Sequence, residues 1–321
     1  MGNLYDSATP ANVQDVLTTT ANYISPGIAD NVFNKHVTNK WFRDNAEEID
    51  GGRYIVEHIE YDSNPTTSFI NANDTVSTSN TPILTDAHYK SVILSGSATI
   101  SDSDLAENNG KNALEDLVKT REKSLLKAAS LTMNKAYFST SPGALAPNSL
   151  HEIIDSSDPS RGDLGGIDRS TYSAWQSNEV AMGSFSLGGL DSISNMIKLI
   201  APAAGMDEPT IAITTSTIFG YFENAMQNRV QIQDKDTAKA GFRSLSYLNT
   251  EFTYDENCTS GYIFYLNPEF IKMRVYSKMN MQLGPYVRPR NQLNMTRLLG
   301  HKYQITTNNP RKLGKHSGVT A

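Results

Sequence analysis

The sequence has one cysteine and no long apolar run. Cys258 alone excludes a disulfide within the chain and a metal cluster built from several cysteines. The longest apolar stretches, such as residues 197–204, fall well short of the roughly 18 residues that a membrane span needs. Residues 1–10 lack the basic and apolar regions of an export signal. We therefore expect synthesis in a reducing, cytosolic compartment and no membrane partner.

The last fifty residues contain no acid. Residues 272–321 hold ten Lys or Arg and no Asp or Glu, which leaves 18 Lys or Arg and 34 Asp or Glu in residues 1–271. The two parts therefore carry formal charges of +10 and −16, which sum to the net charge of −6. Such a division predicts a surface that faces a polyanion, or self-association between unlike patches.

Motifs for nucleotide and metal binding are missing. The nearest approach to a phosphate-binding loop, residues 107–112, lacks its first glycine and its hydroxyl residue. The six histidines show neither HxxxH nor HExxH spacing, so no zinc site is expected. Residues 101–110 offer Asp102 and Asp104 to a calcium ion but place Ala106 at a ligand position. We interpret them as the start of a helix, and we predict no metal and no cofactor.

Motifs for catalysis are also scarce. The segment 183–189 resembles a nucleophile elbow, but Gly183 lies three residues before Ser186, where the motif requires two. Adjacent strand residues point to opposite faces, so Glu57 and His58 are not expected to act together. Carboxylate pairs of the glycosidase kind depend on spacing in the fold and stay open. We predict no catalytic residue and no enzymatic activity.

Residues 161–175 combine a Gly-Gly pair, two carboxylates and a tryptophan, and so look like a site. Neither a base nor a set of metal ligands accompanies them, which favours a structural role. Gly165 and Gly166 permit φ values that are closed to other residues. Asp168 can cap the following turn, and Trp175 supplies apolar area that docks the loop.

Residues 1–50 predict an arm. They include short helical stretches near residues 12–24 and 29–42. Their apolar residues are too few for a core of their own, so we expect the arm to lie on another surface.

A long hairpin is predicted next. Its strands cover residues 53–61, which follow Gly51 and Gly52, and residues 89–100. Residues 62–81 between them are mostly Ser, Thr, Asn and Asp, and they far exceed the roughly two to five residues of an ordinary hairpin loop. The first strand has apolar residues on both faces, as in a ribbon with partners on both sides. Because such a ribbon is only marginally stable alone, it needs a neighbour to lie on.

The strongest helix signal runs from Asn112 to Phe138. Asn112 and Glu115 form a capping box, and the helix would be roughly 40 Å long. One narrow stripe with an arginine and small residues repeats every three or four positions, which favours a helix laid across a sheet. Its members are Leu114, Val118, Arg121, Leu125, Ala128, Thr132 and Ala136.

The second half of the chain predicts one α/β unit. A buried strand rich in β-branched residues is expected within residues 209–215. One helix precedes it over residues 190–201, and another runs from Thr215 or Ser216 to about Gln227.

Two strand pairs are predicted beyond this unit. Residues 261–267 and 270–278 are expected to pair as a hairpin across Asn267 and Pro268, and residues 296–308 are expected to form a second strand pair.

Taken in this order, the elements resemble the major capsid proteins of tailed bacteriophages with the HK97 fold. The resemblance covers essentially the whole chain and is carried by residues 51–61, 104–139, 165–175 and 240–273. It implies an α+β fold with five parts. These are an N-terminal arm (1–50), an extended β-hairpin loop or E-loop (51–90), a peripheral domain with a spine helix (91–187), an axial α/β domain (188–285) and C-terminal strands returning to the peripheral domain (286–321).

The resemblance implies a structural shell protein, made in the host bacterial cytoplasm. Its subunits would form the pentamers and hexamers of an icosahedral virion head around double-stranded DNA, with scaffolding, portal and decoration proteins as further partners. The basic section 272–321 would face DNA nonspecifically or a neighbouring subunit, and we favour the neighbour because a net acidic subunit avoids gripping DNA. The candidate assembly residues are Gly51, Gly52, Gly165, Gly166, Asp168, Trp175, Arg288 and Arg290.

Two departures from the family bear on assembly. Some members begin with a long scaffolding region, whereas about fifty residues precede the hairpin here, so a scaffold would be a separate protein. Other members cross-link a lysine of the extended loop to an asparagine, but no lysine lies between Arg53 and Tyr89, so we predict no such bond. Two alternatives stay open: an encapsulin-like compartment around a cargo enzyme, and an α/β hydrolase that uses Ser186.

Overall fold

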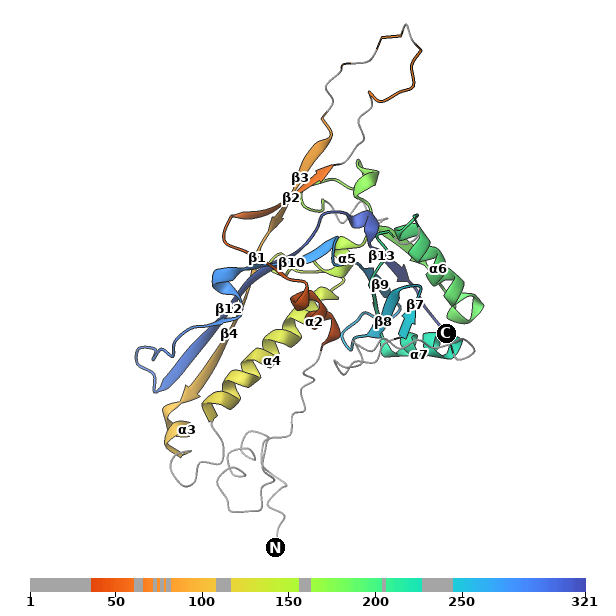
Figure 1. The fold of residues 1–321 in the computed structure, drawn as a ribbon. Helices are drawn as coiled ribbons and strands as arrows, with labels where there is room; N and C mark the ends of the chain where they lie inside the picture. The colour runs from red at the N-terminus through yellow and green to blue at the C-terminus, as the bar shows by residue number, and fades with distance from the viewer. Residues whose placement is uncertain are drawn as a thin grey trace. The chain divides into compact units, whose positions relative to one another are not determined.

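The computed structural model describes residues 36–60, 66–71, 74–75, 78, 82–107, 117–155, 163–203, 206–226 and 245–321 (Figure 1). They form two compact units. The smaller unit comprises residues 95–107, 117–129 and 283–299, and the larger unit holds the rest. No helix in these ranges has the length and apolarity to cross a bilayer. Most of the predicted arm and the predicted capping box at Asn112 lie outside the described residues.

The larger unit carries a two-stranded ribbon of β2 (Tyr54–Glu60) and β3 (Leu84–Lys90), which Figure 1 shows side by side. The strands are antiparallel, with Tyr54 opposite Lys90 and Glu60 opposite Leu84. The prediction of a second strand that starts at residue 89 was wrong. The strand that pairs with β2 ends at Lys90, and after Ser91 the chain forms a separate strand, β4 (Val92–Ser101). We did not predict residues 84–88 as part of a strand, because β3 has one exposed face whose residues are mostly polar.

The predicted long helix is α4 (Leu117–Tyr137), which ends within one residue of the expected position. Its predicted stripe was wrong in the C-terminal half, where the buried face lies one residue further along. Ala129, Met133 and Tyr137 are buried, because Met and Tyr remove more apolar area from water than the Ala and Thr of the predicted stripe. The exposed members of that stripe are Arg121, Ala128 and Thr132.

A six-stranded sheet and two helices form one layered part of the larger unit. The strand order is β5-β13-β9-β6-β8-β7. The strands are β5 (Asn178–Ala181), β13 (Gly314–Ser317), β9 (Ile263–Leu266), β6 (Ile211–Thr214), β8 (Thr250–Tyr254) and β7 (Leu245–Tyr247). Every residue of β6 is buried, which confirms the predicted core strand.

The predicted helices of this part are confirmed as α6 (Gly189–Ile200) and α7 (Ser216–Met226). The Thr215 side chain accepts a hydrogen bond from the Ile218 amide at 3.5 Å, so it caps α7 as expected. Both helices bury apolar side chains in one cluster with the sheet, among them Met196, Phe222 and Phe252.

The prediction of a hairpin between residues 261–267 and 270–278 was wrong. Strand β9 already has β13 on one edge and β6 on the other, so the chain turns at Asn267 into a different sheet. There β10 (Ile271–Tyr276) pairs with β1 (Glu47–Ile49) and with β12 (Asn294–Thr307). Residues 296–307 therefore lie in one long strand, and the predicted strand pair over residues 296–308 was wrong.

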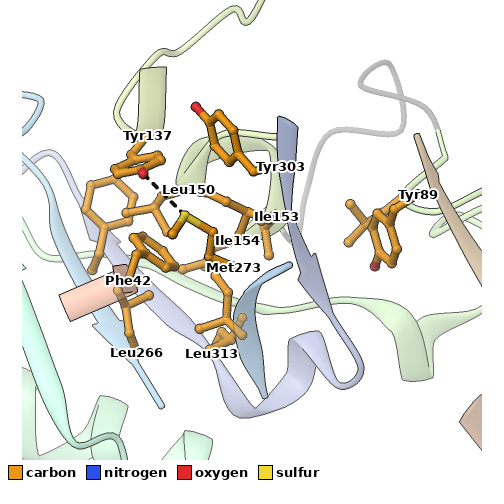
Figure 2. Packing of buried hydrophobic residues seen from close by; sticks show 14 of the residues in the cluster. Phe42, Tyr89, Tyr137, Leu150, Ile153, Ile154, Leu266, Met273, Tyr303 and Leu313 are labelled. Atoms are coloured by element: carbon orange, nitrogen blue, oxygen red, sulfur yellow. Dashed lines mark hydrogen bonds between the residues drawn. The ribbon is translucent and has the colours of Figure 1, made fainter. Parts of the chain in front are cut away.

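The core of the larger unit packs on β10 (Figure 2). Phe42 from α2 (Val37–Asp44) lies 5.0 Å from the Tyr137 ring, centroid to centroid, and the Tyr137 hydroxyl contacts the Met273 sulfur at 3.7 Å. Leu150 and Ile153 from α5 (Leu150–Ile153) complete this cluster. The last helix of the predicted arm is therefore part of the core.

A buried carboxylate fixes α2 in place. Asp255 accepts hydrogen bonds from the Thr38 amide at 3.2 Å, the Thr38 hydroxyl at 2.9 Å and the Asn134 amide group at 2.7 Å. These contacts join α2 and α4 to the end of β8.

The smaller unit contains α3 (Asp102–Glu107). Ser101 caps the start of this helix, because its hydroxyl accepts a hydrogen bond from the Ser103 amide at 3.2 Å. This confirms the predicted helix start. Gly96 packs closely on α4, since a Cβ atom there would lie 2.7 Å from the end of the Leu125 side chain, which would have to move. Arg297 binds Glu122 and donates a bond to the Gly284 carbonyl at 2.6 Å.

Candidate functional site

The base of the β2–β3 ribbon is tied to the core by several side-chain contacts. Glu57 of β2 faces Arg274 of β10, with Nε–Oε1 at 3.0 Å and Nη2–Oε2 at 3.2 Å. The Thr306 hydroxyl donates to Glu57 at 2.9 Å. Two parallel guanidinium bonds to a carboxylate fix direction as well as distance, so β2 leaves the core at a set angle.

Burial raises the pKa of Glu57, an effect that the Thr306 hydrogen bond and the charge of Lys272 partly offset. Glu47 of β1 also binds both Lys272 and Arg274. Two carboxylates and two cations thus form one network at the root of the ribbon.

The other strand of the ribbon is held by two hydrogen bonds, one buried and one partly buried. Tyr89 of β3 is 2 % exposed, and its hydroxyl donates to the Thr307 carbonyl at 2.9 Å. The Gln304 side chain donates to the Lys90 carbonyl at 2.7 Å. Both partners lie on β12, so β12 anchors β3 while β10 anchors β2.

The Gly165–Gly166 turn lies against β3. Both residues have positive φ, +63° and +79°, as predicted from the sequence. The Gly165 carbonyl accepts a bond from the His88 amide at 2.8 Å. A Cβ atom on Gly165 would lie 2.8 Å from the Ala87 Cβ, whereas one on Gly166 would meet open space. Gly165 is therefore needed for close approach to the ribbon, and Gly166 only for its backbone angle.

Asp168 and Trp175 do what the sequence predicted. The Asp168 carboxylate accepts hydrogen bonds from the Thr171 hydroxyl at 2.6 Å and from the Ser170 hydroxyl and amide at 2.7 and 2.8 Å, and these bonds lower its pKa to about 2. Trp175 is 4 % exposed and donates from Nε1 to the Leu164 carbonyl at 2.9 Å. One cap and one buried ring thus hold the loop's shape.

The remaining candidate residues lie elsewhere. Gly52 has φ +116°, and its carbonyl accepts a bond from the Tyr276 hydroxyl at 2.8 Å, whereas Gly51 faces open space. Arg288 binds Asp102 at 3.1 Å in the smaller unit, and Arg290 is exposed there.

The outer face of the ribbon mixes exposed apolar and polar side chains. The apolar ones are Tyr54, Val56 and Leu84, and the polar ones are His58, Glu60, Asp86, His88 and Lys90. Ile55 and Ile59 are buried, while Tyr54 and Val56 on the opposite face are 48 % and 40 % exposed. Further along the loop, Phe69 is fully exposed, as are large parts of Ile70 and Leu84. The ribbon thus has apolar side chains on both faces, as predicted, and only one face is covered by its own chain.

The basic section finds many of its partners inside the chain. Six of its ten cations form ion pairs with acidic residues that precede it in the sequence: Lys272, Arg274, Arg288, Arg297, Lys312 and Lys315. Charge segregation along the sequence therefore reflects pairing in the fold as well as surface charge.

The geometry for catalysis is not assembled at Ser186. It lies in the short 3-10 helix Phe185–Leu187, not after a strand, and its hydroxyl contacts Ser184 at 2.8 Å. Among the described residues, no group of three or more His, Cys, Asp or Glu is placed to hold a metal ion.

Sequence reasoning missed the Glu57, Arg274 and Tyr89 contacts. The partners of each lie 217 or 218 residues away in the chain, and no local pattern reports such distances. The excess of acids before residue 272 and of bases after it was the available signal.

No family model and no curated protein matches the chain significantly, but solved structures do. The capsid asymmetric unit of cyanophage A-1(L) aligns with 94% of this chain and 97% of its own at TM-score 0.72 and 11% identity. The capsid of a native GTA particle covers 93% of this chain and 96% of its own at TM-score 0.62 and 9% identity. The SrpI encapsulin of Synechococcus elongatus PCC 7942 covers 98% and 96% at TM-score 0.56 and 7% identity. The chain therefore has an α+β fold of the HK97 capsid type.

Proposed function

We propose that this chain, which has the HK97-type capsid fold, is the major capsid protein of a tailed bacteriophage. Its copies form the pentamers and hexamers of an icosahedral head that encloses double-stranded DNA. The observation that carries the proposal is the β2–β3 ribbon, which is fixed at its base and exposes apolar side chains beyond it.

A ribbon of two strands is marginally stable in water, so its contacts at the base and a covering partner both matter. Exposed apolar side chains such as Tyr54, Val56 and Phe69 mark surfaces that another protein covers. A second copy is the natural partner, because symmetry repeats one contact around every ring. Many weak contacts then sum to a stable shell.

The division into arm (1–50), E-loop (51–90), peripheral domain (91–187), axial domain (188–285) and C-terminal strands (286–321) belongs to the same proposal. Within residues 286–321, β12 pairs with β10, while β13 pairs with β9. We therefore assign β13 to the axial sheet and leave β12 with the strands that support the ribbon.

The ion pairs of the basic section (residues 272–321) favour contacts with neighbouring subunits over tight binding of DNA. A surface that holds DNA needs cations free to replace counterions on phosphates. Six of the ten cations after residue 271 instead bind acids of the same chain. DNA would accordingly be enclosed without being held tightly.

An encapsulin-like compartment is the second candidate, favoured by the similarity to SrpI over 98% of this chain. The two candidate functions predict different contents inside the assembled particle. Particles purified from cells that carry the phage genes should contain nuclease-protected double-stranded DNA, read out by extraction after nuclease treatment. A stoichiometric cargo protein in place of DNA, identified by mass spectrometry, would favour the compartment and contradict the phage assignment.

A further inference from the structure

A cleft of about 670 Å³ lies beside the loop end of the paired strands, where His58, Ile59, Glu60 and Thr85 line it. Its walls come from the ribbon, from residues 163–175 and from residues 308–311. The Glu57 network does not line it, so the cleft is separate from the contacts that hold the ribbon. Its chemistry is therefore available to a partner.

The lining of the cleft suits a cation with apolar neighbours. Glu60, Asp163 and Asp168 contribute three carboxylates against the single cation of Arg311. The hydrogen bonds to Asp168 lower its pKa to about 2, so that carboxylate is charged at any physiological pH. The remaining wall is mixed: it has polar residues such as Asn308 and Asn309, and it includes the aromatic ring of Tyr172, which is 47 % exposed. Acidic groups beside aromatic rings recognise arginine through ion pairing and stacking.

The chain carries a segment with the matching chemistry. Residues 284–293 hold two arginines and no acid. Arg288 already binds Asp102 at 3.1 Å, whereas no polar partner of Arg290 is found among the described residues. Val287 and Leu293 beside it are 59 % and 79 % exposed.

Hydrogen bonds at both ends fix the conformation of residues 284–293, which we call the Arg290 loop. Val287 and Thr296 exchange two backbone hydrogen bonds of 2.8 and 2.9 Å, and the Tyr286 hydroxyl donates to Glu122 at 2.9 Å. A preorganised loop loses little entropy on docking.

We propose that the Arg290 loop of one copy docks in the cleft of a second copy, with the guanidinium between Glu60 and Asp163 and the aliphatic side chains beside Tyr172. This inference rests on the proposed shell function and names one contact between its subunits. Two segments that the family resemblance also places at subunit contacts, the arm and the tip of the extended loop, fit less well. Residues 1–35 hold three Asp and one Lys, and residues 61–83 hold two Asp and no Lys or Arg, so the carboxylates of the cleft repel both.

Charge reversal tests the contact. Arg290→Glu and Asp163→Arg should each lower the yield of sedimentable particles by about tenfold, because each puts like charges together. The double variant should recover most of that yield. Lys123→Glu, an exposed cation of the same unit as Arg290, is the matched control and should assemble as the wild type does. Full yield from both single variants, or a double variant as poor as either single one, would overturn the contact.

A disulfide test is independent of yield. Two differently tagged chains, one with Asp163→Cys and one with Arg290→Cys, are co-expressed and oxidised, and a non-reducing gel should show a dimer that carries both tags. Chains with only the buried Cys258 are the control. Wild-type shells without this dimer and without charge rescue would overturn the contact and leave the shell function standing. Wild-type protein that forms neither rings nor shells would overturn the shell function itself.

Discussion

Arg274 of β10 holds Glu57 of β2 through two bonds of 3.0 and 3.2 Å, across 217 positions of sequence. The two side chains are 19% and 12% exposed, so the pair is largely removed from water. Removing one partner of such a pair leaves a buried charge uncompensated, which costs much more than losing a surface ion pair. The direction of the ribbon therefore depends on this contact.

Arg274→Met should lower the free energy of unfolding by about 3 kcal/mol, because Glu57 and Glu47 lose their shared partner. Hydrogen exchange at β2 amides, read by mass spectrometry, should accelerate together with the loss of thermal stability. Lys278→Met, which removes an exposed cation two residues beyond β10, should change neither. Equal exchange rates in Arg274→Met and wild type would show that other contacts hold the ribbon.

Gly165→Ala and Gly166→Ala form a matched pair. Both place a Cβ at positive φ, which costs about 1 kcal/mol. Gly165→Ala also forces a contact of 2.8 Å with Ala87 and should cost about 2 kcal/mol more. Chemical denaturation of the two variants checks the order. Equal stabilities would mean that the turn does not pack on β3.

Trp175 should be sensitive to small changes. Trp175→Phe removes the hydrogen bond to the Leu164 carbonyl and should cost about 1 to 2 kcal/mol, whereas Trp175→Ala also leaves a cavity and should cost about 3 to 5 kcal/mol. We expect Trp175→Ala to reduce the yield of assembled particles. Normal particle yield from Trp175→Ala would contradict a role for this loop in assembly.

His316 makes stability fall in acid. Burial lowers its pKa from 6.5 to about 4, so between these values the unfolded chain binds a proton that the folded chain does not. Stability is therefore complete above about pH 6.5 and is lost as the pH falls towards 4, by up to about 3 kcal/mol. The Tyr265 hydroxyl beside it, 3.1 Å away, has a pKa far above this window and does not titrate there.

The comparison of wild type with His316→Gln isolates this effect. The variant should be less stable at pH 7, yet it should lose less stability between pH 7 and pH 4, as measured by urea unfolding at each pH. Parallel pH curves would show that His316 titrates normally.

Sequence patterns correctly predicted the elements whose structure depends on interactions between residues close together in the sequence. The β-branched run at β6, the cap at Thr215 and the turn at Gly165 and Gly166 were all visible, since each depends on neighbours in sequence. The order of these elements along the chain was enough to predict the fold, although the sequence identity to the matched structures is only 11% or lower.

Other features depend on distant partners and were not predictable. Strand β9 pairs with β13 rather than β10, because the last residues of the chain return to occupy its edge. The buried face of α4 follows from where β10 and Phe42 lie, and the stripe in the helix alone gave the wrong residues. The ribbon anchors Arg274 and Tyr89 needed the same long-range information.

Cryo-electron microscopy of the purified, assembled protein shows whether the chain builds a shell. We expect closed shells of pentamers and hexamers in which β2 and β3 of each copy lie over a neighbouring copy, with Tyr54 and Val56 covered. Single 35.3 kDa particles at all concentrations, or shells in which the ribbon touches no neighbour, would contradict this expectation.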